Sequence, residues 1–372
     1  PTLVRRDPQD LEPAVTLRGR AAAVVGSLAV AIAGCTAIAH LKALQPPSPQ
    51  APDSSSTALA RMPAPAMPGA PRVQLGVDVT AYTYPGEDIA RAAHADVAFV
   101  RSLHANSVMV SFPFFASGRG SVSAGKATPS PNALGTVIRV AEQAGLFVLL
   151  RPLLDERGLG RSRVSWVPPS LPRWFASYRR FLKPYAEVAQ WLHVPEFAVG
   201  AELSRFETAP GWGRLDTMLR RRYHGRLAFT LNWDAAQQAV HVGGPHVLHT
   251  VDAYAPQSGN FTAGWERYDR TLPRGTVETE IGIAAVRGAN RAPSRWHWNV
   301  KTLDQGMQVR WFTAACQAAQ ATHLGGIYFW SIQLSTPVAT GPVPAHQGAW
   351  AAGAGRNAIA QCFAAMDRGR RA

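Results

Sequence analysis

The sequence predicts an α/β protein whose main domain is a (β/α)8 barrel, the TIM-barrel fold. From residue 73 onward, short apolar segments of β type alternate with amphipathic segments of helix type, which favours parallel strands joined by right-handed crossovers. The apolar segments number eight, as a closed barrel requires. An open doubly wound sheet is the alternative, but no G-x-G-x-x-G follows the first segment and no P-loop occurs.

The expected elements follow one another in regular order. Strands are expected at residues 73–79, 107–115, 146–154, 196–203, 226–233, 250–254, 276–283 and 325–332. The helices between them are expected where apolar residues recur at a spacing of three and four. They cover residues 88–104, 132–144, 170–193, 213–224 and 303–323, and a further helix is expected at the C-terminus.

Two segments precede the barrel. Residues 1–44 contain an uncharged run of 19 residues, 21–39, with basic residues on both sides. Such a run can just span a bilayer, and its positive flank is typical of an export signal or membrane anchor. Residues 45–72 hold eight prolines, which predicts an extended linker. The barrel domain is then expected at 73–372.

The three cysteines indicate in which cellular compartment the barrel is expected. Cys35 ends the sequence Ile32-Ala33-Gly34-Cys35, which resembles the bacterial lipobox and predicts a lipidated cysteine, with an uncleaved anchor as the equal alternative. Both place the barrel in the cell envelope, at the extracytoplasmic face of the cytoplasmic membrane; a secreted protein is the remaining option. Disulfides persist there, so Cys316 and Cys362 are a possible pair, with two buried free thiols as the alternative.

Charge and motifs exclude several function classes. The net charge of +14 resides mostly in the barrel and would suit an acidic polymer or an anionic envelope surface, but we favour the composition bias of a GC-rich genome as its explanation. No nucleic-acid motif occurs, so nucleic acid is not an expected partner, and no protein partner is evident. No CxxC or Cys/His cluster has metal-ligand spacing, and we expect neither a metal nor a cofactor.

The residues at the strand ends are the candidates for chemistry, because active sites of such barrels lie there. Glu202 and Glu280 stand out, since a glutamate in an apolar strand is costly unless it is paired or functional. Glycoside hydrolysis needs two carboxyl groups: one protonates the leaving oxygen, and the other attacks the anomeric carbon or activates water. Glu278 has the same strand parity as Glu280 and is its rival; we favour Glu280 because it lies nearer the strand end.

These residues resemble the clan A glycoside hydrolases, and within the clan they are most similar to family 113, over residues 73–350. The resemblance rests on Ala105-Asn106-Ser107-Val108, Leu149-Leu150-Arg151-Pro152-Leu153-Leu154-Asp155, Trp174-Phe175-Ala176-Ser177-Tyr178, Val199-Gly200-Ala201-Glu202-Leu203, Leu231-Asn232-Trp233-Asp234, Asp252-Ala253-Tyr254 and Thr279-Glu280-Ile281-Gly282. It implies a retaining enzyme, β-mannanase-like, with Glu202 as acid/base and Glu280 as nucleophile. Many clan members have Asn before the acid/base, where this chain has Ala201, so the contact to the sugar 2-hydroxyl stays unassigned.

The other strand-end residues are expected to bind substrate. Trp330 would be an aromatic platform under the sugar or else a barrel-wall residue. Tyr254 would donate a hydrogen bond to the nucleophile or else bury its ring. Arg151 and Asp155 would grip the substrate or form a structural ion pair. The remaining candidates for the cleft lining are Asn232, Trp233, Asp78 and Tyr82.

The sequence therefore predicts a tethered, cofactor-free glycoside hydrolase that cleaves a polysaccharide or oligosaccharide by double displacement. A barrel that binds carbohydrate or assists envelope-polysaccharide assembly without hydrolysis is the alternative from another class. A further clan A activity, such as transglycosylation, is the third reading. A serine hydrolase with a Ser-His-Asp triad is disfavoured, because no G-x-S-x-G occurs.

Overall fold

The computed structural model describes residues 69–238, 242–244, 247–295, 298, 302–336 and 345–368. The predicted anchor, with Cys35, and the linker as far as residue 68 lie outside the described residues. In the part of the chain that is described, no helix has the length and apolar character needed to cross a membrane.

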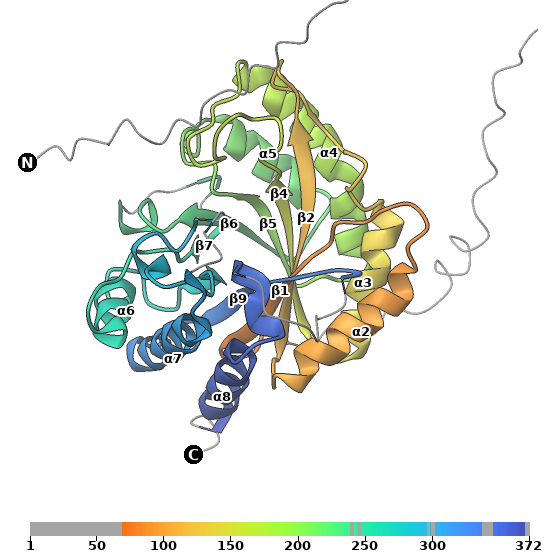
Figure 1. The fold of residues 1–372 in the computed structure, drawn as a ribbon. Helices are drawn as coiled ribbons and strands as arrows, with labels where there is room; N and C mark the ends of the chain where they lie inside the picture. The colour runs from red at the N-terminus through yellow and green to blue at the C-terminus, as the bar shows by residue number, and fades with distance from the viewer. Residues whose placement is uncertain are drawn as a thin grey trace, which may run out of the picture. The chain divides into compact units, whose positions relative to one another are not determined.

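Eight parallel strands form a closed barrel, so the predicted fold is confirmed (Figure 1). They are β1 (Gln74–Thr80), β2 (Ser107–Ala116), β4 (Phe147–Leu154), β5 (Glu196–Ala201), β6 (Arg226–Asn232), β7 (Leu248–Asp252), β8 (Val277–Ile281) and β9 (Gly326–Gln333). The barrel closes because β1 pairs with both β2 and β9. The short strand β3 (Val122–Ser123) was not predicted and pairs antiparallel with the end of β2.

The helices surround the strands (Figure 1). They are α2 (Ile89–Ser102), α3 (Pro131–Gln143), α4 (Leu171–Trp191), α5 (Gly211–Arg220), α6 (Phe261–Asp269), α7 (Gln305–Thr322) and α8 (Gly355–Arg368). Four of them begin where a side chain accepts a backbone N–H of the first turn, namely at Asp88, Ser130, Ser170 and Asn260. Between β6 and β7 the described residues contain only the 3-10 turn Ala236–Gln238.

The interior of the barrel is filled in layers, as closed barrels of eight strands are. A layer in the middle of the barrel is apolar and consists of Met109, Leu149, Ala198, Ala228 and Tyr328. The Tyr328 ring lies so close to Gly76 that a Cβ atom there would be 2.2 Å from it, which explains the glycine on β1. The next layer is polar and carries the candidate site.

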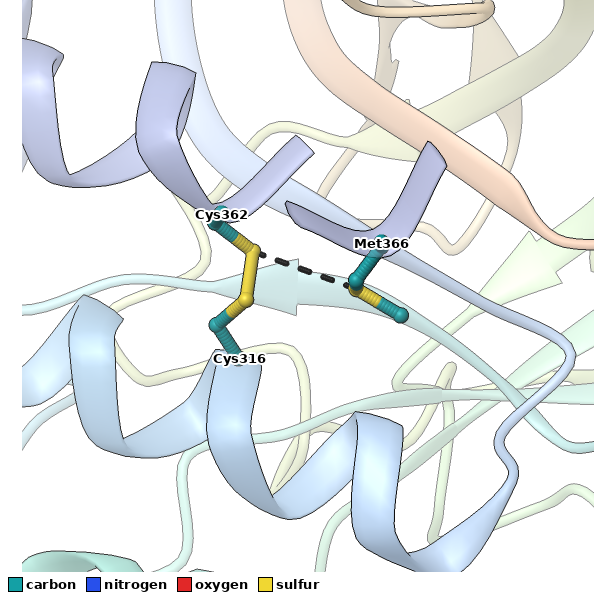
Figure 2. Close-up of a disulfide and its surroundings, with 3 residues drawn as sticks. All are labelled: Cys316, Cys362 and Met366. Carbon is teal, nitrogen blue, oxygen red and sulfur yellow. Dashed lines mark hydrogen bonds between the residues drawn. A yellow bond between two sulfur atoms is a disulfide. The ribbon is translucent and has the colours of Figure 1, made fainter. Parts of the chain in front are cut away.

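A disulfide joins the last two helices, as the sequence suggested. Figure 2 shows Cys316 on α7 bonded to Cys362 on α8, with the sulfur of Met366 4.0 Å from that of Cys362. Both cysteines are buried in the core. The bridge spans 46 residues of sequence and fixes α8 against α7.

Replacing both cysteines by serine should lower the free energy of unfolding by about 2–4 kcal/mol, because the unfolded chain then regains the entropy of an open loop. Denaturant unfolding of the wild type and of the Cys316→Ser/Cys362→Ser variant measures the difference. Reductant should lower the midpoint of the wild type and leave that of the variant unchanged. A wild-type midpoint that is indifferent to reductant would contradict the bridge.

Candidate active site

A buried arginine organises the polar layer of the barrel. Arg151 on β4 is completely buried, and each of its three nitrogens has a partner from another strand. Nη1 donates to both carboxylate oxygens of Asp252, at 2.9 and 3.1 Å, and Nε donates to the Ser111 hydroxyl at 3.0 Å. Nη2 donates to Oε1 of Glu280 and lies 3.7 Å from a carboxylate oxygen of Asp78. The guanidinium fork thus fixes the position of Glu280.

Glu280 lies near the end of β8, with a donor on each carboxylate oxygen. Arg151 donates to Oε1, and the Tyr254 hydroxyl donates to Oε2 at 2.7 Å. Hydrogen bonds of this kind stabilise the charged form of a carboxyl group. The hydroxyl of Tyr254 also lies 3.3 Å from the side-chain oxygen of Gln347, a residue that the sequence did not single out.

Glu202 is the first residue after β5 and has an unusual backbone conformation. Its φ of 54° lies in the left-handed region, which costs a residue with a Cβ atom about 1–2 kcal/mol. The pairing of β5 with β6 is irregular just before it, and its N–H donates to the Thr230 carbonyl at 3.0 Å. Strained backbone is one of the features that cluster at active sites. The turn directs the Glu202 carboxyl group to the cavity wall.

The electrostatic surroundings of Glu202 differ from those of Glu280. Burial raises the pKa of Glu202 to about 7; the nearby Arg163 guanidinium opposes this, and the charge of Glu280 adds to it. Arg163 Nη1 donates to Glu202 Oε2 at 3.0 Å. A pKa raised toward neutrality suits a group that gives and takes a proton.

Sequence reasoning missed Arg163. It lies in the loop after β4, where its Nε donates to the Leu154 carbonyl at 2.9 Å and lies 3.5 Å from Glu156. The loop has no periodic pattern and also contains Arg157 and Arg161, so the sequence offers no signal that separates Arg163 from its neighbours.

A cavity of about 370 Å³ opens at the C-terminal ends of the strands, and both glutamates lie on its wall. Four of the predicted substrate-binding residues also line it: Tyr254, Asn232, Trp233 and Trp330. Asn232 donates to Asp234 at 2.5 Å, and the Trp330 ring centroid lies 5.5 Å from the Arg151 guanidinium. The structure thus brings the two carboxyl groups and four of the expected partners together.

The other predicted residues lie elsewhere. Tyr82 and Asp155 line a second, larger cavity of about 710 Å³, where the Tyr82 hydroxyl donates to Asp155 at 2.8 Å. Arg151 and Asp78 lie beneath the cavity of the two glutamates, completely buried. Burial raises the pKa of Asp78 to about 8 although Arg151 opposes this. In the part of the chain that is described, no group of His, Cys, Asp and Glu could hold a metal ion.

Glu278 does not face the cavity, which corrects the expectation that it could point inward beside Glu280. Its carboxyl group is buried against α6 and shares a hydrogen bond with Asp269. Burial raises the pKa of both groups, that of Asp269 to about 7. The pairing of β8 with β9 shifts between Glu278 and Ile281, so simple alternation along the strand fails there.

A model of one family matches most of the barrel: residues 90–338 match glycoside hydrolase family 113. The chain belongs to glycoside hydrolase family 113. The resemblance seen in the motifs is therefore confirmed, and the protein is a glycoside hydrolase with a carbohydrate substrate.

Solved structures of family 113 enzymes have the same fold. A family 113 β-1,4-mannanase is 18% identical with a TM-score of 0.67, over 79% of this chain and 99% of that one. A family 113 β-mannanase from Alicyclobacillus acidocaldarius, in complex with ManMIm, is 20% identical with a TM-score of 0.64, over 79% of this chain and 98% of that one. No functionally curated protein matches the chain.

Replacing Arg163 of this family 113 hydrolase by glutamine should raise the pKa of Glu202 by on the order of one pH unit, because an opposing positive charge is lost. Carbon-13 NMR of labelled glutamate carboxyl groups measures it directly. The matched control is Arg161→Gln, an exposed arginine of the same loop, which should leave the titration of Glu202 where it is. An unchanged Glu202 pKa in Arg163→Gln would show that the ion pair has no influence.

Proposed function

We propose that this family 113 enzyme cleaves a β-linked polysaccharide with retention of configuration, with Glu280 as nucleophile and Glu202 as acid/base. One observation carries the proposal: two glutamates on one cavity wall differ in the hydrogen bonds and charges around them. Glu280 accepts hydrogen bonds from Arg151 and Tyr254, whereas the burial of Glu202 favours its protonated form. Pairs of carboxyl groups with such different surroundings divide the roles of glycoside hydrolysis between them.

In the first step, Glu280 attacks the anomeric carbon while Glu202 gives its proton to the glycosidic oxygen. The bond between that carbon and oxygen breaks, the leaving group departs as an alcohol, and an ester to Glu280 forms. In the second step, Glu202 takes a proton from water as the water oxygen attacks the same carbon, and the ester bond breaks. Two inversions restore the original configuration, and both side chains return to their starting states.

The surroundings of the glutamates serve both steps. Arg151 and Tyr254 hold the two oxygens of Glu280 and return it to the same position after each cycle. Arg163 stabilises Glu202 as a carboxylate while the ester exists, which is when Glu202 must act as a base. Trp330, which packs on the Arg151 guanidinium, offers an aromatic surface to the apolar face of a sugar.

The substrate that we propose is a manno-configured, β-1,4-linked chain cut at internal bonds. The printed names of the similar family 113 structures, a β-1,4-mannanase and a β-mannanase, support this. Internal cleavage is supported by the second cavity, which shares Glu156 and Arg163 with the catalytic one and so extends the site along a chain.

We also propose that the enzyme works outside the cytoplasm, tethered through the predicted anchor. The Cys316–Cys362 disulfide supports this, because such bonds persist in oxidising compartments and are rare in the cytosol.

Azide rescue tests the two roles. On a mannoside with a good leaving group, Glu202→Ala should still form the ester, and azide should then release the β-azide, with configuration retained. Glu280→Ala should lose at least about a thousandfold in kcat, and azide entering its vacant position should give the α-azide. NMR of the products distinguishes the anomers. The opposite assignment of anomers to variants would reverse the roles.

Glu278→Gln is the matched control for Glu280. The pKa of Glu278 is raised, which favours its protonated form, and its carboxyl group hydrogen-bonds Asp269 of α6. A glutamine side chain has the same shape as a protonated glutamate and can therefore replace it. We expect kcat of Glu278→Gln to stay near the wild-type value. A loss as large as that of Glu280→Ala would contradict the distinction between these two residues.

The pH profile tests the acid role of Glu202. The general acid must be protonated in the free enzyme, so kcat/KM should fall about tenfold per pH unit above pH 7, near the Glu202 pKa. Glu202→Gln should remove this basic limb on substrates with a good leaving group, which need no proton. A basic limb that persists in Glu202→Gln would assign the titration to another group.

A further inference from the structure

The second cavity carries a charge that a neutral sugar would not need. Its volume of about 710 Å³ lies within the range of ligand sites, and it adjoins the catalytic cavity at Glu156 and Arg163. Three guanidinium groups line it, those of Arg157, Arg163 and Arg295, against two carboxyl groups. The lining itself has a formal excess of one positive charge, and Arg163 of this set also pairs with Glu202 of the adjoining cavity.

Both carboxyl groups of the wall already have donors. Asp155 accepts hydrogen bonds from Nε and Nη2 of Arg157, the latter at 2.8 Å, and from Tyr82 at 2.8 Å. Glu156 accepts from the Arg163 backbone N–H at 2.9 Å and from the Ser162 hydroxyl at 3.1 Å. Both carboxylates of the wall therefore already accept hydrogen bonds from protein groups.

Arg295 provides the positive charge that lacks this compensation. Its guanidinium lies 5.1 Å from the ring centroid of Trp298, and no carboxylate of the described residues lies within ion-pair distance of it. Arg157 uses Nε and Nη2 for Asp155, and its Nη1 takes no part in those bonds. Guanidinium groups bind carboxylates and phosphates through two parallel N–H donors.

The same wall offers aromatic surface for a sugar ring. The Tyr84 side chain is 45% exposed beside Tyr82, whose ring also lies under the Arg157 guanidinium at 5.5 Å. We propose that the second cavity is a subsite for a sugar that bears an anionic group, the carboxylate of a hexuronic acid or a phosphate ester. This proposal rests on the proposed function, because it takes the two cavities as parts of one polysaccharide site. The proposed subsite narrows the substrate class to acidic polysaccharides.

Two oligosaccharide probes measure the contribution of the sugar's negative charge to binding. Oligosaccharides of β-1,4-mannuronan and of β-1,4-mannan share linkage and ring configuration and differ at carbon 6, a carboxylate in the first and a hydroxymethyl group in the second. Titration calorimetry with the full chain carrying Glu280→Gln measures their Kd at low salt without turnover. We expect mannuronan to bind at least about tenfold more tightly than mannan of the same length, and added salt to reduce the difference.

Arg295→Gln locates the effect. It should remove most of the preference for mannuronan over mannan, and a thermal unfolding midpoint equal to that of the parent protein shows that the variant is folded. The matched control Arg291→Gln removes an exposed charge from the same segment, outside the cavity wall, and should keep the preference. A mannan oligosaccharide phosphorylated at carbon 6 is the third probe; if it binds more tightly than mannuronan, the anion is a phosphate ester.

Three results would overturn the inference: equal Kd values for mannuronan and mannan, no binding of any probe, or equal losses in Arg295→Gln and Arg291→Gln. Retaining hydrolysis is assayed separately, with the wild type and neutral mannan. Hydrolysis without a charge preference would refute only the anionic subsite. A preference for mannuronan without hydrolysis of any probe would refute only the proposed function.

Discussion

The geometry around Glu280 in the candidate site depends on one buried cation. Arg151 is completely buried inside the barrel and joins β2, β7 and β8 to β4 through Ser111, Asp252 and Glu280. A buried charge costs several kcal/mol unless it is paired and hydrogen-bonded, and losing one partner of such a pair is strongly destabilising. The interactions that fix the position of Glu280 are therefore the same ones that offset the cost of burying charge in the polar layer. A substitution that disturbs one of them is expected to affect both the site and the stability of the barrel.

More than one acidic group surrounds this one cation. Burial reduces the excess of negative charge because it favours the protonated form of these groups. Burial raises the pKa of Asp78 to about 8 and that of Asp252 well above its usual range, with Arg151 opposing in both cases. A raised pKa favours the protonated form, and a proton on such a group reduces the repulsion among the acids. Asp252 also accepts a hydrogen bond from Thr279 at 2.9 Å, so a residue of β8 one position before Glu280 is fixed by the same layer.

The sequence sufficed for the barrel because its strands are buried on both faces and are therefore continuous apolar runs. The sequence also sufficed to single out Glu202 and Glu280 as candidates, because a charged residue contrasts with such apolar strands. Helix α6, with nine residues, is too short for a clear periodic pattern. The outward orientation of Glu278 depends on an irregular pairing of β8, which exists only once the sheet has formed. Arg163 reaches Glu202 from 39 residues away in sequence, through a loop without a pattern.

In the proposed function, the groups that react and the groups that select the substrate belong to different parts of the fold. Glu280 and Arg151 come from barrel strands and are held by buried hydrogen bonds, whereas Arg157 and Arg295 come from loops and lie at the surface. Loops at this end of a barrel tolerate changes that the strands do not. A substituted sugar beside the catalytic cavity can therefore be selected by loop charges without disturbing the two glutamates. Arg163 joins the two regions, because it lines both cavities and donates to Glu202. An anion bound in the second cavity would lie close enough to this arginine to alter the acidity of the acid/base, which would couple substrate choice to catalysis.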